Sequence, residues 1–324
     1  MLKNFSYVRA KSLDEAVEQL RAAGGRVHAG GTDLVGCLRD GVFEVERVVS
    51  IGAIDALKGI REQSGGGVRI GALTRIAEVA NSPVIAERFA ALARAASEVG
   101  TPQLRNQGTL GGNICQKTRC AYYRGPFPCR RKGGERCFAI EGNTEAHAIF
   151  GGGRCYMVHP SDTATALTAL NASIAVEGPR GARTIPIDRF FVLPEVDPTR
   201  ETVLEQGEVV TEVILPASGA GLRSSYRKVR MRRSWDFALA GVALALRKDA
   251  GGAVSEARVA FSGVAPVPWR SAATEGVITG QRLTEDVVRR AAEAAVAEAD
   301  PMPDNAYKVD LLRGIVAQEL AAMA

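Results

Sequence analysis

The first 180 residues alternate between strand-like and helix-like spacings of apolar positions. A capping box at residues 12–15 (Ser-Leu-Asp-Glu) and an apolar stripe up to Leu20 predict a helix that ends at Gly24-Gly25. Short apolar runs at 26–29 and 47–51 predict strands on either side of a helix at 32–40. These three elements form a small βαβ unit.

The same alternation continues to the end of this region. It predicts a strand at 68–71, a helix that Thr74 caps, a longer helix from Ser82-Pro83 to about Val99, a helix at 162–170 and a strand at 173–176. A Gly-Pro-Arg-Gly segment at 178–181 resembles a linker. We therefore expect a first domain over 1–178 and a second over 182–324.

The second half has a different pattern. Apolar, closely spaced runs at 209–215, 224–229, 237–246 and 257–262 predict an antiparallel sheet. Helical spacing at 284–299 and 309–323 predicts two closing helices. The expected fold class is α+β.

Composition narrows the class of protein further. No apolar run reaches the ~18 residues of a membrane span, and the N-terminus lacks the apolar region of a secretory signal, so we expect a soluble, cytoplasmic protein.

The net charge of +5 comes from basic residues interleaved with 36 acidic ones, and aromatics are only 6%. This pattern suits a protein partner or an anionic substrate as well as nucleic acid, and we expect no nucleic acid.

Two glycine pairs stand where a strand or turn meets a helix. Residues 27–34 read Val-His-Ala-Gly-Gly-Thr-Asp-Leu, and residues 109–114 read Thr-Leu-Gly-Gly-Asn-Ile. Backbone N–H groups at such points favour an anion, so a pyrophosphate could bind there. Each pair alone is typical of an ordinary turn, and neither matches a standard nucleotide-binding fingerprint. The two together are a stronger signal than either.

Five of the six cysteines fall between residues 115 and 155. They contain no C-x2-C pair of the kind that zinc ribbons use, which favours an iron-sulfur cluster over zinc. Seven basic residues between Cys115 and Cys137, against the single acidic Glu135, would offset the negative charge of a thiolate-ligated cluster. The alternative is a basic, glycine-rich surface loop with unligated thiols. Cys115 is the expected spare, and Cys37 is expected to be a buried apolar residue.

Motifs along the whole chain resemble one family. These motifs occupy residues 29–34, 109–113, 160–162, 226–229, 233–240 and 262–266. Together they are similar to the FAD-binding medium subunit of the molybdenum hydroxylases, the xanthine and carbon monoxide dehydrogenase family. The resemblance implies a two-subdomain FAD-binding domain of the PCMH or vanillyl-alcohol-oxidase-like type, followed by a carbon monoxide dehydrogenase flavoprotein-like domain. It also implies an oxidoreductase subunit whose partner carries out the substrate chemistry.

The insertion at about 115–157 looks like that of the β subunit of 4-hydroxybenzoyl-CoA reductase, which carries an additional [4Fe-4S] cluster. This resemblance implies that Cys120, Cys129, Cys137 and Cys155 are the cluster ligands. The family resemblance places the following residues at FAD: Val27, His28, Ala29, Gly30, Gly31, Thr32, Asp33, Leu34, Thr109, Gly111, Gly112, Asn113, Asp162, Leu204, Tyr226 and Lys228.

The implied partners are a large molybdopterin-binding subunit, a small [2Fe-2S] subunit and a ferredoxin-like donor. Electrons would then flow inward and remove a phenolic hydroxyl from an aromatic CoA thioester. Three alternatives stay open: an oxidative hydroxylase subunit that passes electrons outward, a zinc-stabilised binding module, and a stand-alone flavin oxidoreductase of the vanillyl-alcohol type.

Overall fold

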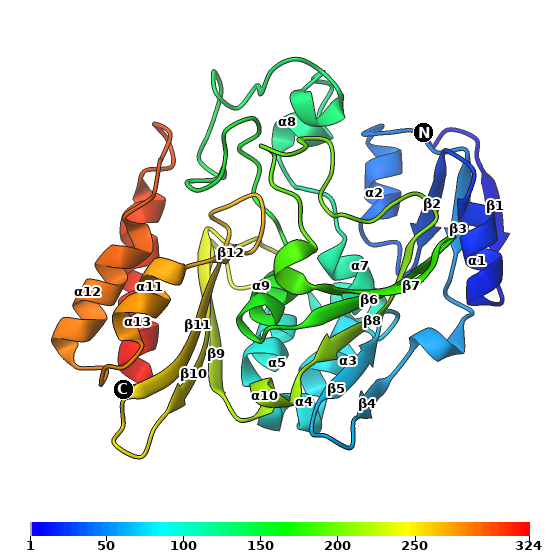
Figure 1. The fold of residues 1–324 in the computed structure, drawn as a ribbon. Coiled ribbons are helices and arrows are strands. Elements are labelled where there is room, and N and C mark those ends of the chain that lie inside the picture. Colours follow the sequence, from blue (N-terminus) through cyan, green and yellow to red (C-terminus); the bar gives the residue numbers. More distant parts are fainter. Residues whose placement is uncertain (1) are drawn as a thin grey trace.

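The computed structural model describes residues 2–324, which form three sheets (Figure 1). The N-terminal sheet is entirely parallel, with strand order β1-β3-β2. Apolar residues of its first helix pack on this sheet around Val49 and Ile51. The predicted βαβ unit is confirmed. The elements are β1 (Ser6–Arg9), α1 (Leu13–Leu20), β2 (Gly25–His28), α2 (Leu34–Arg39) and β3 (Arg47–Ser50).

The central sheet is antiparallel and has the order β4-β5-β8-β6-β7. Its strands are β4 (Ile60–Glu62), β5 (Val68–Gly71), β6 (Ser173–Gly178), β7 (Gly181–Pro186) and β8 (Val209–Leu215). The helices of this part are α3 (Ile76–Asn81), α4 (Pro83–Arg88), α5 (Ala90–Ser97), α6 (Pro102–Gln107), α7 (Leu110–Ile114) and α9 (Asp162–Ala169). The largest apolar core joins these helices to the sheet.

The C-terminal sheet is also antiparallel, with the order β12-β11-β10-β9. Helices α11 and α13 contact one part of this sheet, while α5 and α9 of the central part contact β9, β10 and β11 (Figure 1). The sheet is therefore packed between two groups of helices. The elements are β9 (Arg223–Val229), β10 (Ala240–Lys248), β11 (Val254–Ser262), β12 (Trp269–Arg270), α10 (Ala217–Ala220), α11 (Ala272–Ile278), α12 (Glu285–Val296) and α13 (Tyr307–Ala322).

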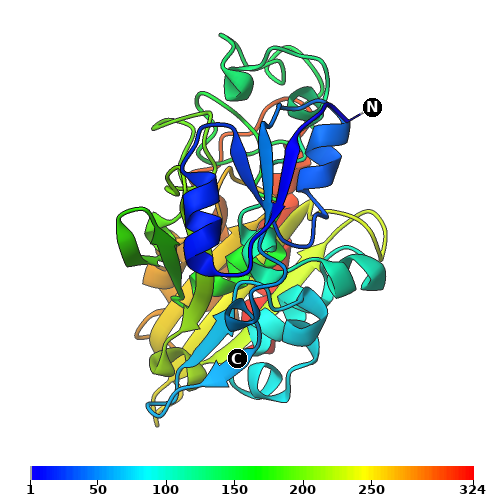
Figure 2. The same cartoon turned by 90° about the vertical axis from the view of Figure 1, so that its right-hand side faces the viewer.

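The cysteine-rich segment, residues 115–157, has little regular structure. It contains the short helix α8 (Ala121–Arg124) and a 3-10 turn at Arg130–Lys132. Figures 1 and 2 both show its coils at the top of the molecule, beyond the sheets and beside the N-terminal part. We call this segment the cysteine loop.

Two expectations differ from the structure. The long helix predicted from Ser82-Pro83 is split at Phe89, whose backbone (φ −138°, ψ 51°) leaves the helical region while its side chain is fully buried. The boundary expected between 178 and 182 falls in the turn of the β6–β7 hairpin, where Gly178 pairs with Gly181. The strand at 209–215, expected in the second domain, is β8 of the central sheet. The chain changes sheet later, between β8 and β9.

One further feature of the fold concerns the length and apolar character of its helices. Among residues 2–324, no helix combines the length and the apolar character that crossing a bilayer requires.

Candidate functional site

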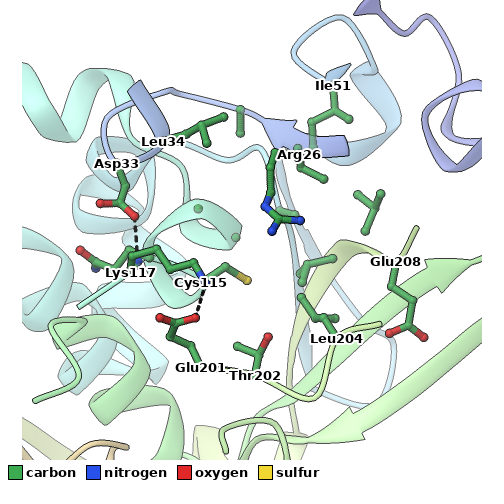
Figure 3. Close-up of a pocket in the computed structure, with 18 of the residues that line it drawn as sticks. Arg26, Asp33, Leu34, Ile51, Cys115, Lys117, Glu201, Thr202, Leu204 and Glu208 are labelled. Carbon is green, nitrogen blue, oxygen red and sulfur yellow. Dashed lines mark hydrogen bonds and ion pairs between the residues drawn. The ribbon is translucent and has the colours of Figure 1, made fainter. Parts of the chain in front are cut away.

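A cavity of about 420 Å³ lies between the N-terminal sheet and the central sheet (Figure 3). Its volume falls within the usual range of small-molecule sites. Three segments supply much of its lining: the turn after β2, the start of α7, and residues 199–210, which lead into β8. Of the residues expected at FAD, those in the lining are Val27, Ala29, Gly30, Gly31, Thr32, Asp33, Leu34, Thr109, Gly111, Gly112 and Leu204.

Two glycines of this cavity, Gly30 and Gly111, occupy positions with no room for a side chain. A Cβ on Gly30 would lie 2.1 Å from the Gln107 carbonyl oxygen, and one on Gly111 would lie 2.8 Å from the Ala72 Cβ. Gly31 has φ +72°, a conformation that glycine adopts without strain. The amides of Gly30 and Gly31 donate to no backbone carbonyl within the described chain. Bare, unpaired N–H groups on a cavity wall suit a phosphate-bearing cofactor.

Asp33 connects the first glycine turn to the cysteine loop. Its carboxylate accepts a hydrogen bond from the Lys117 backbone N–H at 2.7 Å (Figure 3). It also accepts one from Arg124 Nη2 at 2.8 Å. Arg119 Nη2 forms an ion pair with the same carboxylate at 2.9 Å. Because three groups of the loop share this one carboxylate, the start of the loop is fixed against the cavity.

Asp162, Tyr226 and Lys228 meet in a buried cluster that is not part of the cavity lining. The Tyr226 hydroxyl donates to Asp162 Oδ1 at 2.6 Å, and Lys228 Nζ donates to Oδ2 at 2.8 Å. Burial, and then the Asp162 charge, raise the pKa of Tyr226 well above its ordinary value. This cluster joins the start of α9 to β9, so it holds the central part to the C-terminal sheet.

Asn113 and His28 also lie outside the cavity lining. The Asn113 side-chain oxygen accepts from the hydroxyls of Ser161, at 2.6 Å, and Thr163, at 2.7 Å. It therefore joins α7 to the start of α9. The His28 ring lies edge-on to Tyr7, with 6.3 Å between ring centroids, and burial lowers the pKa of His28.

A second, smaller cavity lies inside the cysteine loop. All four expected cluster ligands line it, with Tyr122, Tyr123, Arg130, Arg131, Phe138 and Met157. Cys115 lines the larger cavity instead. The free space among the four thiols is about 10 Å³, close to that of one water molecule, and the four sulfurs are the donor set that an iron-sulfur cluster uses. Within residues 2–324, no three His, Cys, Asp or Glu side chains are grouped as a site for one metal ion.

The thiols of this smaller cavity interact with one another and with nearby polar groups. A hydrogen bond from Cys155 lowers the pKa of Cys137 to about 5, and the same contact raises the pKa of Cys155. Cys120 Sγ lies 3.3 Å from His147 Nε2. Burial raises the pKa of Cys115 to about 12, so that residue remains a thiol.

Six charged residues of the larger cavity lie outside the set expected at FAD: Arg26, Lys117, Arg200, Glu201, Glu205 and Glu208. The Arg26 side chain points into the cavity, with its guanidinium 5.7 Å from the centroid of the Phe43 ring (Figure 3). Glu201 is buried and pairs with Lys117. No local pattern distinguishes Glu201 from its polar neighbours Thr199 and Arg200. Its position depends entirely on tertiary contacts.

Comparisons with known proteins identify the class. Residues 3–218 match the model of the FAD binding domain in molybdopterin dehydrogenase, and residues 224–322 match the carbon monoxide dehydrogenase flavoprotein C-terminal domain. The fold and the cavity therefore define a two-domain FAD-binding subunit. The chain belongs to the family of FAD-binding subunits of the molybdenum hydroxylases. The gap between the two matched regions coincides with the change of sheet between β8 and β9.

Two relatives illustrate the similarity. The chain is 35% identical to the aldehyde oxidoreductase FAD-binding subunit PaoB of Escherichia coli (strain K12), over 99% of this chain and 98% of that protein. It is 33% identical to the carbon monoxide dehydrogenase medium chain of Hydrogenophaga pseudoflava, over 93% of this chain and 88% of that one.

A solved structure agrees with these relationships. Carbon monoxide dehydrogenase from Hydrogenophaga pseudoflava, in a form that lacks the Mo-pyranopterin moiety of the molybdenum cofactor, matches with a TM-score of 0.78 and 31% identity. The match covers 98% of this chain and 96% of that chain.

The packing of the first glycine turn yields a prediction. Gly30→Ala places a methyl group against the Gln107 carbonyl, so the turn must move and FAD content should fall by at least half. The matched control is Gly36→Ala, in α2, where a Cβ meets nothing within 4 Å. FAD per chain, measured by absorbance after purification, should be unchanged in the control. Full FAD content in Gly30→Ala would show that this turn does not form the cofactor wall.

The buried cluster at α9 yields a second prediction. Asp162→Asn leaves the Lys228 ammonium, whose side chain is 1% exposed, without its counter-charge. The free energy of unfolding should fall by about 3–5 kcal/mol, as for other broken buried pairs. Urea unfolding measures the loss, and adding Lys228→Met should recover part of it. Asp286→Asn, which breaks exposed surface pairs with Arg289 and Arg290, should leave the free energy of unfolding nearly unchanged. Equal losses in the two single variants would contradict the assignment.

Proposed function

We propose that this chain is the FAD- and [4Fe-4S]-carrying electron-transfer subunit of a molybdenum hydroxylase-type complex that oxidises its substrate and passes electrons outward. One observation carries the proposal: the four cysteines singled out by the sequence line a single cavity, and that cavity adjoins the one lined by the glycine turns. Lys117 belongs to the lining of the larger cavity and Cys120, three residues later, to that of the smaller.

FAD is the group that the larger cavity would hold. The glycine turns at Gly30-Gly31 and Gly111-Gly112 would contact its phosphates, and Leu204 would contact an apolar part of it. When bound, a flavin exchanges one or two electrons and so can join a two-electron centre to one-electron clusters. We assign Asn113, Asp162, Tyr226 and Lys228 a positioning role behind the cavity. Asn113 accepts from Ser161 and Thr163 at the start of α9, while Tyr226 and Lys228 of β9 donate to Asp162.

The donor set of the smaller cavity suits an iron-sulfur cluster. Four cysteines are the usual ligands of a [4Fe-4S] cluster, and such a cluster is held between thiolates that surround it. Arg131 lines the cavity beside the four thiols. A cation at this point would offset the negative charge of ligated thiolates. The four thiols line one cavity, and their spacing contains no C-x2-C pair of the kind that zinc ribbons use, which favours a cluster over one zinc ion.

The names of relatives favour the oxidative direction. PaoB is named as part of an aldehyde oxidoreductase, and other relatives are named as parts of carbon monoxide, glyceraldehyde and nicotinate dehydrogenases. We infer an aldehyde as the substrate class, a large molybdopterin-binding subunit and a small [2Fe-2S] subunit as partners, and a ferredoxin-like acceptor at the basic cysteine loop. The cytoplasmic location expected from the sequence stays a prediction.

A second candidate function rests on the cysteine loop. Its resemblance to the insertion of the 4-hydroxybenzoyl-CoA reductase β subunit supports inward flow from a reduced ferredoxin to an aromatic CoA thioester. The two candidates share the same cofactors in this chain and differ in the direction of electron flow.

The cluster assignment predicts a selective loss of iron. Cys129→Ser removes one thiolate from the smaller cavity, so most of the roughly four iron atoms expected per chain should be lost. FAD should stay bound, because Cys129 does not line the larger cavity. In the matched variant Cys115→Ser, iron should be retained. Iron and flavin analysis of the purified complexes measures both, and iron retained in Cys129→Ser would overturn the ligand assignment.

The proposed direction of electron flow predicts which of two reactions the complex catalyses. The purified complex should oxidise benzaldehyde with ferricyanide or oxidised ferredoxin as acceptor. It should not dehydroxylate 4-hydroxybenzoyl-CoA with reduced viologen as donor. Spectrophotometric assays of both reactions on one preparation make the comparison, and the opposite result would select the reductive candidate.

A further inference from the structure

One buried carboxylate lies between the two candidate cofactor cavities. Glu201 is 6% exposed and lines the larger cavity, and its backbone carbonyl accepts from the Val192 N–H at 3.0 Å. Its two carboxylate oxygens bind different cations of the cysteine loop. Lys117 Nζ donates to Oε2, and Arg131 contacts Oε1 through Nε at 3.1 Å and through Nη2 at 2.8 Å (Figure 3 shows the Lys117 contact).

Arg131 connects this carboxylate to the thiols. It follows Cys129 by two residues, its side chain is 1% exposed, and it lines the smaller cavity. Its third contact, from Nη1 to the Pro198 carbonyl at 2.8 Å, anchors it to the same segment that carries Glu201. A rigid guanidinium held on two sides has little freedom to move away from the thiols. The Arg131–Glu201 pair therefore spans the wall between the cavities.

Glu201, Lys117 and Arg131 keep their charges because they pair with one another. Burial would raise the pKa of Glu201, but Lys117 and Arg131 together bring it below its ordinary value, so the carboxylate is ionised. One anion with two cations leaves a net charge of +1, in a region where Glu201 and Arg131 are buried and Lys117 is partly exposed. Charges act more strongly on one another in such surroundings than in solvent. A change of charge at either cavity therefore affects the other through these residues.

We propose that Glu201 is a positioning residue that electrostatically couples the two cofactor sites, by holding Lys117 in the FAD cavity and Arg131 against the cluster thiols. This inference rests on the proposed function. Each electron accepted by a cofactor adds one negative charge, so the reduction potential of each depends on the fixed charges nearby. The negative charge of Glu201 opposes reduction at both sites, and its removal makes reduction easier at both.

The test uses the complete purified complex and begins with its iron and FAD content. Potentiometric titration then follows the flavin by visible absorbance and the cluster by electron paramagnetic resonance. Glu201→Gln keeps the size of the side chain and removes its charge. We expect the midpoint potentials of flavin and cluster both to shift to more positive values. Arg131→Met removes the opposite charge, and both potentials should shift to more negative values.

A matched control comes from the central sheet. Glu212 of β8 also binds two cations, Arg61 and Arg69, but lines neither cavity. Glu212→Gln should leave both potentials unchanged. If Glu201→Gln cannot be isolated with both cofactors, the sign of the shifts in Arg131→Met decides the question. Potentials that do not move, or a shift at one cofactor only, would overturn the coupling while leaving the proposed function intact. Wild-type protein without iron would overturn both.

Discussion

Two largely buried carboxylates, Asp33 and Glu201, hold the cysteine loop against the FAD cavity. Asp33 binds Arg119, Arg124 and the backbone of Lys117, while Glu201 binds the side chains of Lys117 and Arg131. The loop has little regular secondary structure, so these contacts supply much of its fixed geometry. Other contacts, such as those from Thr144 to Asp304 and from Lys308 Nζ to the His147 carbonyl, hold the later part of the loop.

Ion pairs of this kind contribute more to position than to stability. Removing two charges from water costs free energy that their attraction offsets only when the geometry is good, so a buried pair is weak evidence for net stabilisation. Here the ion pairs of Asp33 and Glu201 fix the cysteine loop relative to the larger cavity. The loop enters the fold between α7 and α9, so a second site is placed beside the first without interrupting any sheet.

The sequence predicted those parts of the fold that depend on local pattern. The βαβ unit, the strands β9 to β11 and the two closing helices have clear periodicity, and the structure confirms them. The domain boundary was expected at a Gly-Pro-Arg-Gly segment, which forms a hairpin turn in the structure. The same residues suit a linker and a two-residue turn, so the sequence does not distinguish the two. The structure places Cys120, Cys129, Cys137 and Cys155 around one cavity and Cys115 at the other, and their assignment as ligands and spare stays a prediction. Glu201 and Arg131 could not be paired from sequence, since they are 70 residues apart.

The central claim is that one chain carries two redox cofactors in adjoining cavities. Electron paramagnetic resonance of the isolated, chemically reduced chain tests it most directly, because no partner subunit can then contribute an iron-sulfur signal. The account predicts the signal of a reduced [4Fe-4S] cluster, in protein that also contains about one FAD per chain. A flavin-containing chain with no cluster signal and with zinc in place of iron would contradict it.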